Sequence, residues 1–304
     1  MKLFRDLDLR QPIAPACVAT IGNFDGIHLG HQALIDRVEK EAAARELAAV
    51  LVTFEPLARE YFAPEKAPGR IYNASQRIRQ LSRQHLDAVW LMRFNRYLAS
   101  LSADEFVQYL IKGINPQLVV VGEGFRFGRD RAGTVESLGF GGAVEVVAMP
   151  AVCVDDERVS STRIRRVLAD GDMDAAGRLL GRPFGMYGRV VRGQQLGRTL
   201  GFPTANIRLH RRSTPINGIF AVRVSGGGLT QQPGVASIGT RPTVGGKETL
   251  LEVHVFDFSG DLYGTHLDVT LVAKLRDEEK FDDLDTMTVQ MHEDARQARE
   301  LLAA

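Results

Sequence analysis

The stretch CVATIGNFDGIHLGH (residues 17–31) decides the fold of the first half of the chain. It begins with the continuous apolar run 17–22, which is typical of a strand buried on both faces in a parallel sheet. The glycine-containing turn that follows leads into an amphipathic pattern over residues 34–42, which predicts a helix. A strand, a tight turn and a helix in this order indicate an alternating α/β domain.

Four further apolar runs of strand length continue this alternation up to residue 150. They are AAVLVTF (48–54), DAVWLMRF (87–94), LVVVG (118–122) and VEVVAM (144–149). Between two of them a capping box begins at Ser102, with Glu105 three residues later, and predicts the start of a helix. Two more helical patterns cover 160–169 and 172–180. We therefore expect a parallel sheet flanked by helices.

The character of the sequence changes near GRPFG (181–185), where short strands begin to follow one another with glycine-rich turns. The strand candidates are GMYGRVVRG (185–193), GIFAVRVSGGG (218–228), PGVASIG (233–239), LLEVHVFDF (250–258) and LDVTLVAKL (267–275). This pattern predicts an antiparallel barrel or sandwich. A last helix is expected from about Asp283, and we interpret its apolar stripe as a face that docks on the barrel; the stripe comprises Leu284, Met287, Met291, Ala295, Ala298 and Leu302. The predicted domains are residues 1–183 and 184–304.

The composition is that of an ordinary globular protein, with 44% hydrophobic and 25% charged residues. A net charge of +1 argues against a surface that coats nucleic acid, and no apolar run reaches the roughly 18 residues of a membrane span. The N-terminal segment carries charges where a signal peptide needs an apolar core, so we expect a cytoplasmic protein without a membrane partner. Cys17 and Cys153 are interpreted as buried core thiols. The oligomeric state does not follow from the sequence.

Two histidines and two glycines form the first candidate site. Gly22 and Gly26 would allow a tight turn, and His28 and His31 are three apart, so both rings would project from one face at the start of a helix. Helix N-terminal amides favour an anion, and two imidazoles add donors for a triphosphate. No Gly-x-x-x-x-Gly-Lys-Ser/Thr segment is present. ATP binding would therefore need another phosphate-binding arrangement, such as these histidines at a helix N-terminus. The alternative is a pair of solvent-facing histidines near a loop.

The segment RGQQLGRTLGFPTANI (192–207) forms the second candidate site. On a strand, Thr204 and Asn206 would face the same side, where a hydroxyl and an amide oxygen are suitable ligands for Mg²⁺ or partners for phosphate. Alternatively, Thr204 and Asn206 are polar surface residues of a bulged barrel strand. Spacing alone does not decide between a binding site and a polar surface.

Several segments together resemble one family. Residues 22–31 resemble the HxGH signature of nucleotidyltransferases, and VVVGEGFRFGRDRAG (119–133) and VSSTRIRRVL (159–168) resemble later motifs of the bacterial bifunctional riboflavin kinase/FAD synthetases. Residues 193–206 match the riboflavin kinase segment G-x-x-x-G-R-x-x-G-F-P-T-A-N. The resemblance implies a Rossmann-like nucleotidyltransferase domain followed by a small antiparallel barrel domain with a C-terminal helix. One departure is Gly124, where the family usually carries Asp or Asn.

The resemblance also implies an activity and its site residues. Riboflavin would be phosphorylated to FMN by ATP, and FMN adenylylated to FAD by a second ATP with release of pyrophosphate, with Mg²⁺ at both centres. The implied catalytic residues are Glu252, as general base for the 5′-hydroxyl of riboflavin, and His28 and His31, as charge-stabilising groups. The implied nucleotide contacts are Gly22, Phe24, Asp25, Gly26, His28, His31, Ser161, Thr162, Arg165, Gly193, Gly197, Thr204 and Asn206. The implied flavin contacts are Phe125, Phe127 and Arg276, and the implied metal ligands are Thr204 and Asn206.

Other interpretations stay open at this point. Ser160 or Ser161 could be only a helix cap, and Glu252 only an exposed strand carboxylate. Alternatively only one centre works, with the N-terminal half serving another acceptor and Gly124 marking the divergence. A flavin-binding regulator, or an RNA-binding relative of the class I synthetases, belongs to a different class; the balanced charge, the lack of a Lys-Met-Ser-Lys-Ser segment and intact motifs in both halves argue against it.

The change near residue 183 generates a testable prediction. A fragment of residues 184–304 should fold alone and convert riboflavin to FMN without making FAD, because the implied kinase residues all lie within or after 193–206. Chromatography of the flavins after incubation with Mg-ATP measures both products. A fragment that is well folded but inactive would show that the boundary or the site assignment is wrong.

Overall fold

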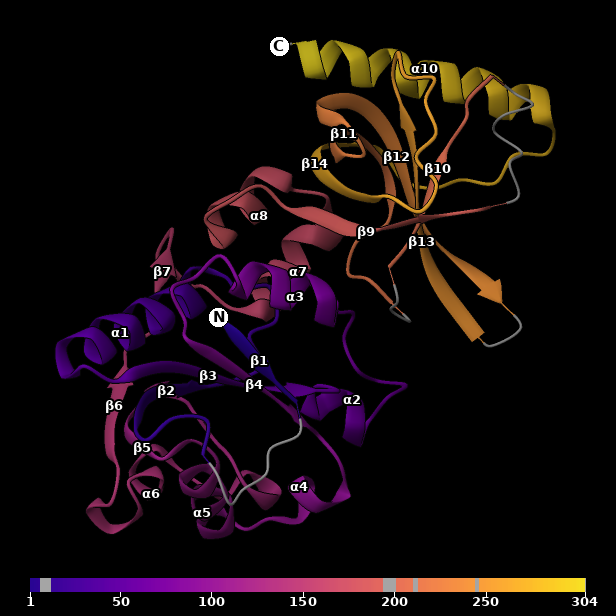
Figure 1. The fold of residues 1–304 in the computed structure, drawn as a ribbon. Helices are drawn as coiled ribbons and strands as arrows, with labels where there is room; N and C mark the ends of the chain where they lie inside the picture. The colour runs from indigo at the N-terminus through magenta and orange to yellow at the C-terminus, as the bar shows by residue number, and fades with distance from the viewer. Residues whose placement is uncertain (6–11, 194–200, 210–212, 244–245, 304) are drawn as a thin grey trace. The chain divides into compact units, whose positions relative to one another are not determined.

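A computed structural model describes residues 1–5, 12–193, 201–209, 213–243 and 246–303 (Figure 1). The chain forms two compact units, Met1–Ala67 with Arg77–Val159, and Pro68–Gln76 with Ser160–Ala304. The helices α7 (Ser161–Asp170) and α8 (Met173–Leu180) thus group with the second unit. The boundary between the two predicted domains, at residues 183/184, stays a prediction. In the described residues no helix is long and apolar enough to cross a membrane.

The first unit is built on a six-stranded parallel sheet in the order β1-β4-β3-β2-β5-β6 (Figure 1). The strands are β1 (Lys2–Phe4), β2 (Cys17–Ile21), β3 (Ala48–Glu55), β4 (Ala88–Arg93), β5 (Pro116–Gly122) and β6 (Glu145–Met149). The five predicted strands are confirmed. The edge strand β1 was not predicted, since three residues carry too short a pattern to detect.

Helices cover both faces of this sheet, which explains why its strands are continuous apolar runs. On one face, α1 (Leu29–Arg45) and α3 (Ala74–Leu81) pack against alternate strand residues such as Val18 and Leu51. On the other, α4 (Arg96–Ser100), α5 (Ala103–Ile114) and α6 (Val135–Leu138) pack against Ala19, Val52 and Trp90. The unit also contains α2 (Ala58–Phe62) and the hairpin of β7 (Cys153–Val154) and β8 (Glu157–Arg158).

Local sequence signals set the ends of these helices. At α5 the backbone N–H of Ser102 donates to Glu105 Oε2 at 2.8 Å, and the N–H of Glu105 donates to Ser102 Oγ at 3.3 Å, which confirms the predicted capping box. Hydrogen bonds to the Glu105 carboxylate from the backbone N–H of Ser102, and secondarily from its side chain, lower the pKa of Glu105. Helix α1 ends at Glu46, whose left-handed backbone (φ 55°) stops the helix where the apolar pattern stops.

In the second unit, the described strands close into an antiparallel barrel in the order β10-β13-β12-β11-β14-β9. The strands are β9 (Gly185–Val191), β10 (Ala205–Arg208), β11 (Gly218–Gly226), β12 (Leu229–Thr243), β13 (Gly246–Val255) and β14 (His266–Arg276). Closure depends on β9, which pairs with β10 on one side and with β14 on the other. The predicted barrel is therefore confirmed, and its closure leaves no unpaired edge.

Helix α10 (Leu284–Ala303) lies along the barrel, as its apolar stripe predicts (Figure 1). Ala298 and Leu302 are buried against Ala221 and Phe256. The prediction is wrong at Leu284, which is 64% exposed; the α10 residues that join the core cluster are Ala295, Ala298 and Leu302, in the C-terminal half of the helix. A polar residue, Asp294, is buried on the same stripe, 4% exposed.

The two cysteines differ in their surroundings. Cys17 is fully buried, its thiol donates to the carbonyl of Ile114 at 3.0 Å, and burial raises its pKa to about 12. Cys153 was predicted to be buried, but it is exposed, because β7 belongs to a two-stranded hairpin that covers no core.

This difference predicts selective alkylation. Iodoacetamide at pH 8 should modify Cys153 in the folded protein and leave Cys17 unmodified, because only the thiolate of an accessible cysteine reacts. Mass spectrometry of the labelled peptides measures this, and both cysteines should react after denaturation. Labelling of Cys17 in the native protein at a rate close to that of Cys153 would contradict the burial of β2.

Candidate active sites

The loop after β2 lies at the point where the strand order of the sheet reverses. Strand β2 pairs with β3 on one side and with β5 on the other, and the chain builds outward from it in both directions. In open α/β sheets, the crevice beyond the carboxyl ends of such strands is where ligands bind. Residues 22–28 therefore occupy the position in this unit that is best suited to a ligand.

This loop adopts an uncommon backbone conformation. Phe24 (φ 48°), Gly26 (φ 88°) and Ile27 (φ 44°) are all left-handed, which agrees with the tight turn predicted at Gly26. For bulky or β-branched residues such a conformation costs on the order of 1–3 kcal/mol each and persists only where the surroundings hold it. Phe24 and Ile27 are 0% and 1% exposed, so their burial offsets this cost.

His28 and His31 lie together, as their spacing predicts. His28 is the N-cap of α1, and the backbone N–H of His31 donates to its Nδ1 at 3.3 Å. Because an accepting ring nitrogen carries no proton, the proton of the neutral ring is assigned to Nε2, which is then a donor. The two rings stack with centroids 3.6 Å apart, and His28 is only 6% exposed. A helix N-terminus and a fixed imidazole donor together suit a phosphate.

Aromatic side chains gather at the carboxyl ends of the neighbouring strands β3 and β4, where Phe54 and Phe94 are partly buried. The ring centroids of Tyr61, Phe62 and Phe54 lie 5.4, 5.7 and 5.8 Å from that of Phe94. Phe62 is 66% exposed. The sequence analysis did not single out this cluster, although the aromatic density of FEPLAREYF (54–62) directly after a strand is a detectable signal.

The two phenylalanines predicted to contact flavin have different environments. Phe127 is 6% exposed and packs on Phe106, with ring centroids 5.5 Å apart, whereas Phe125 is partly exposed and stacks on Phe127 at 5.7 Å. A Cβ added at Gly124 would meet no atom within 4 Å, so the site has room for the Asp or Asn that the family usually carries.

The Ser-Ser-Thr segment begins α7 in the second unit, whereas His28 and His31 belong to the first. Ser160 caps the helix, accepting the N–H of Arg163 at 3.1 Å, so the predicted capping role is real. Arg165 donates from Nε to the carbonyl of Gly69 at 2.8 Å. Arg165 therefore holds the segment Pro68–Gln76 against α7 within this unit.

In the barrel, strand pairing places Asn206 directly opposite Glu252. The register of β10 with β13 pairs these two residues, and the register of β12 with β13 pairs Ser237 with Glu252. Residues opposite each other in an antiparallel pair project to the same side, with Cβ atoms about 5 Å apart. Glu252 is half-buried between buried neighbours, so it lies on the outer face of its strand, whereas Val253 faces the interior.

The residues before β10 provide the remaining candidate ligands. Thr204 was expected on the same strand as Asn206, but the strand begins at Ala205 and Thr204 lies on the loop before it. Asn206 Nδ2 donates to the carbonyl of Thr204 at 3.5 Å. A Cβ added at Gly193 would lie 2.5 Å from Nδ2 of Asn206, so only glycine leaves space for this amide. Gly197 lies outside the described residues.

These oxygen donors suit Mg²⁺ bound mainly by substrate phosphates. Among the residues that the structure describes, no group of three His, Cys, Asp or Glu side chains could hold a metal alone. Mg²⁺ usually retains water and takes only one or two protein ligands when it is bound with phosphates. The hydroxyl of Thr204 and the amide oxygen of Asn206 are oxygen donors of the kind that such an ion accepts, so the donor set fits it.

Packing fixes the loop that carries Thr204. His254 Nδ1 lies 2.9 Å from the carbonyl of Pro203, and its ring lies 5.1 Å from that of Phe202. Phe202 is 5% exposed and also meets His292 of α10, with centroids 4.7 Å apart. The position of the Pro-Thr-Ala-Asn segment therefore depends on contacts with β13 and with α10.

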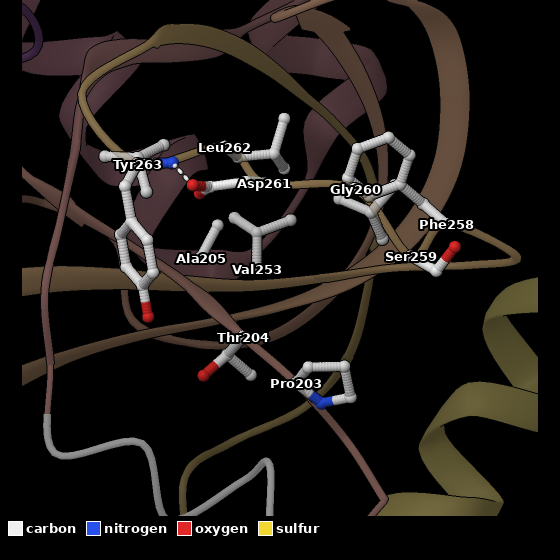
Figure 2. Close-up of a pocket in the computed structure, with 12 residues that line it drawn as sticks. Pro203, Thr204, Ala205, Val253, Phe258, Ser259, Gly260, Asp261, Leu262 and Tyr263 are labelled. Atoms are coloured by element: carbon white, nitrogen blue, oxygen red, sulfur yellow. Dashed lines mark hydrogen bonds between the residues drawn. The ribbon is translucent and has the colours of Figure 1, made fainter.

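A cavity of about 570 Å³ adjoins this loop at one end of the barrel (Figure 2). Val190, Val253 and Val255 form an apolar wall, and Pro203 and Thr204 line one side. The loop 258–263 lines the other, where Tyr263 N donates to Asp261 Oδ1 at 2.8 Å (Figure 2). An apolar wall with a few polar groups at its margin is typical of a pocket for a planar organic ring.

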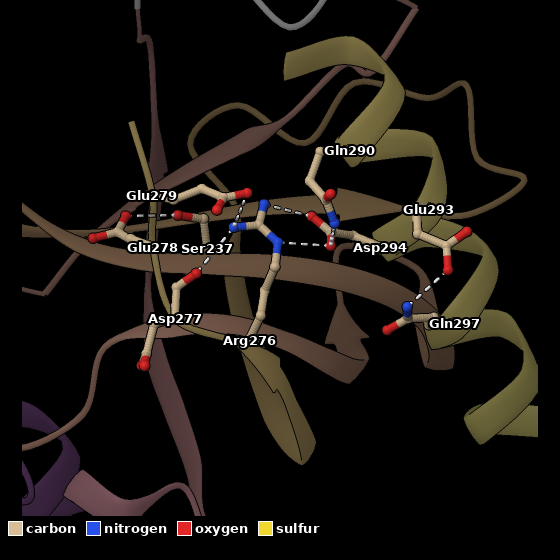
Figure 3. A network of polar contacts seen from close by, with 9 residues as sticks. All are labelled: Ser237, Arg276, Asp277, Glu278, Glu279, Gln290, Glu293, Asp294 and Gln297. Carbon is tan, nitrogen blue, oxygen red and sulfur yellow. Dashed lines mark hydrogen bonds and ion pairs between the residues drawn. The ribbon is translucent and has the colours of Figure 1, made fainter. Parts of the chain in front are cut away.

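Arg276, predicted to contact flavin, joins β14 to α10 (Figure 3). Its Nε and one terminal nitrogen each donate to Asp294 at 2.8 Å, and Gln290 donates to the same carboxylate at 3.0 Å. The hydrogen bonds with Asp294 raise the pKa of Arg276. The planar face of the guanidinium also lies 5.7 Å from the ring of Phe281. In the described structure the guanidinium fork is thus occupied by an internal carboxylate.

Comparison with known proteins gives a separate family description for each part of the chain. A family model described as FAD synthetase matches residues 10–163, and one described as riboflavin kinase matches residues 180–302. The first therefore covers the His28 loop, and the second covers Asn206 and Glu252.

Full-length relatives carry both descriptions. The chain is 45% identical to the bifunctional riboflavin kinase/FMN adenylyltransferase of Pseudomonas fluorescens, over 100% of this chain and 98% of that protein. It is 42% identical to the protein of the same description from Escherichia coli K12, over 99% and 97%. A solved structure described as a macrolide-efflux protein from Streptococcus pneumoniae superposes with a TM-score of 0.81 at 34% identity, over 98% of this chain and 99% of that one. The chain belongs to the family of bifunctional riboflavin kinase/FMN adenylyltransferases.

Proposed function

We propose that the chain converts riboflavin to FMN and FMN to FAD, using one ATP for each step, with the kinase step on the barrel and the adenylyl step at the His28 loop. The observation that carries the proposal is the pairing of Asn206 with Glu252 across β10 and β13. It brings a phosphate- or metal-binding amide beside a carboxylate that can act as a base. The matches to both family descriptions and to relatives named for both activities support it.

In the kinase step, Glu252 accepts the proton of the riboflavin 5′-hydroxyl while that oxygen attacks the γ-phosphorus of ATP. The new bond joins the 5′-oxygen to phosphorus, the bond to the β-γ bridging oxygen breaks, and ADP leaves. Such a transfer depends mostly on positioning and charge neutralisation. Asn206 and Thr204 position the phosphates through hydrogen bonds, and Mg²⁺, if held by these two residues, would supply the charge neutralisation.

In the adenylyl step, an FMN phosphate oxygen attacks the α-phosphorus of ATP and pyrophosphate leaves. The nucleophile is already anionic, so no base is required. His28, with its Nδ1 occupied by the N–H of His31, donates from Nε2 to the developing negative charge. The N-terminus of α1 adds its amides to the same region.

Two further surfaces fit the substrates. In the cluster of Phe54, Tyr61, Phe62 and Phe94 at the carboxyl edge of the sheet, Tyr61 and Phe62 are exposed, and an isoalloxazine ring of FMN would stack on them. The cavity beside Thr204 suits the adenosine of the ATP used by the kinase, since the triphosphate would then pass over Thr204 toward Asn206.

Substitutions in each unit test the assignment. Glu252→Gln retains shape but loses basicity, so riboflavin phosphorylation should fall by roughly 10²- to 10⁴-fold while added FMN is still converted to FAD. The double variant His28→Ala/His31→Ala should show the reverse, with FAD formation reduced by at least about 10²-fold. Chromatography of riboflavin, FMN and FAD measures both steps in each variant.

Each variant serves as the folding control of the other. Loss of both activities in Glu252→Gln would indicate unfolding or interdependent units, and retention of the kinase step would leave Glu252 as a strand carboxylate. FAD formation within a few-fold of the wild type in the double histidine variant would reject the loop as the adenylyl site. Tightly retained flavin without any turnover would instead favour a flavin-binding regulator.

Filling the cavity provides a separate prediction. Ala205→Phe places a ring against the wall formed with Val253 and should raise the KM of the kinase for ATP by about tenfold or more, without changing FAD formation from FMN. Phe258→Tyr, which adds only a hydroxyl at the opposite margin, is the matched control. An unchanged KM for ATP in Ala205→Phe would show that the adenosine binds elsewhere.

A further inference from the structure

Hydrogen bonds at the start, in the middle and at the end of the strained loop between β2 and α1 hold it in place. At its start, the N–H of Gly22 donates to the carbonyl of Val52 in β3 at 3.0 Å. At its end, the side-chain amide of Gln32 donates to the carbonyl of Ile27 at 2.8 Å. In the middle, the carbonyl of Asn23 accepts two hydrogen bonds from side chains of other elements. This carbonyl immediately precedes Phe24, the first of the left-handed residues.

The two donors to the Asn23 carbonyl are Thr53 and Arg77. Thr53 Oγ1 lies 3.2 Å from it, and a terminal nitrogen of Arg77 lies 2.9 Å from it. Thr53 is fully buried and Arg77 is 1% exposed. Hydrogen bonds from a charged donor are stronger than those between neutral groups, so Arg77 provides the main restraint at this point.

The same guanidinium also holds the carboxyl end of β3. Its other terminal nitrogen donates to the carbonyl of Phe54 at 2.7 Å and to Oε2 of Glu55 at 2.9 Å. One rigid group thus joins the turn before His28 to the strand end that carries Phe54. A planar guanidinium can serve both carbonyls at once, whereas a lysine ammonium presents one point charge on a flexible stem.

We propose that Arg77 is a positioning residue for adenylyl transfer: it fixes the loop 22–28, and hence His28, against the carboxyl end of β3. The inference rests on the proposed role of the His28 loop. A buried, paired charge is weak evidence for a stabilising role, and a strained turn next to a phosphate-binding donor needs a restraint in the folded state. Catalytic donors must be held to within about half an ångström of their productive geometry.

Arg77→Lys tests this by keeping the charge and the ion pair with Glu55 while losing the fork. The kcat for FMN to FAD should fall about tenfold or more, because displacement of a catalytic donor by about an ångström has effects of this size. The KM for ATP should remain unchanged, since the helix N-terminus and the loop still offer their donors. Riboflavin phosphorylation, measured in the same sample, should equal that of the wild type.

Thr53→Val is the second variant, because it removes the other donor to Asn23 without removing a charge. It should lower the same kcat in the same direction but less than Arg77→Lys, and the double variant should be non-additive because both act through one carbonyl. Arg45→Lys is the control: Arg45 lies in the same unit and pairs with the carboxylates of Glu41 and Glu145, and its substitution should change neither step.

The outcomes separate this inference from the proposed function. If His28→Ala/His31→Ala abolishes FAD formation while folded Arg77→Lys and Thr53→Val retain the wild-type kcat, the positioning role is rejected and the site assignment stands. If the histidine variant retains FAD formation, the site assignment fails, and the inference fails with it. If Arg77→Lys loses both activities through unfolding, the kcat of Thr53→Val decides, with an unchanged value rejecting the proposal.

Discussion

Strand register is the constraint on which both candidate sites depend. In the barrel, the pairing of β10 with β13 sets Asn206 opposite Glu252, and a slip of one residue would turn one of the two side chains into the interior. The buried residues Ile207, Leu251 and Val253 prevent such a slip, because they would become exposed by it. In the parallel sheet, the pairing of Ile21 with Val52 aligns the ends of β2 and β3, so that Asn23 lies within reach of Thr53 and of Arg77. Apolar packing therefore positions polar chemistry in both units.

The two candidate nucleotide sites are built differently, and neither contains a P-loop. The first presents a helix N-terminus and stacked imidazoles after a turn with two non-glycine left-handed residues. The second presents a loop held by His254 and Phe202, with a glycine at position 193 that leaves space for Asn206. In each case a segment of uncommon or crowded backbone is stabilised by contacts from neighbouring strands. Such segments carry function when the surrounding scaffold holds them.

Much of the fold could be predicted because the apolar runs are long and their periods are clear. Strands β2 to β6, the capping box at Ser102 and the docking helix all followed from local pattern. The features that escaped prediction depend on contacts distant in sequence. The exposure of Cys153 depends on the position of β7 in a two-stranded hairpin, which the local sequence does not indicate. The exposure of Leu284 depends on which part of α10 packs on the barrel.

The candidate sites likewise contain some features that follow from local sequence pattern and others that depend on contacts distant in sequence. The stacked histidines and the tight turn at Gly26 follow from spacing, whereas the partner of Arg276 is Asp294, eighteen residues away on a helix whose rotation the sequence does not give. Nothing in the local sequence distinguishes Arg77 from the other arginines of its helical segment. Its hydrogen bond to the Asn23 carbonyl depends on the fold. The aromatic cluster around Phe94 likewise combines two strand ends from different parts of the chain.

The central claim is that the barrel and the His28 loop each carry one of the two steps, and that FMN made at the first is released before it reaches the second. Mixing the Glu252→Gln variant with the His28→Ala/His31→Ala variant tests this most directly, with riboflavin and Mg-ATP as the only substrates. The account predicts that neither variant alone forms FAD from riboflavin, and that the mixture does, because FMN made on one molecule reaches the His28 loop of the other. A mixture that forms no FAD, although each variant carries out its remaining step on added substrate, would contradict it.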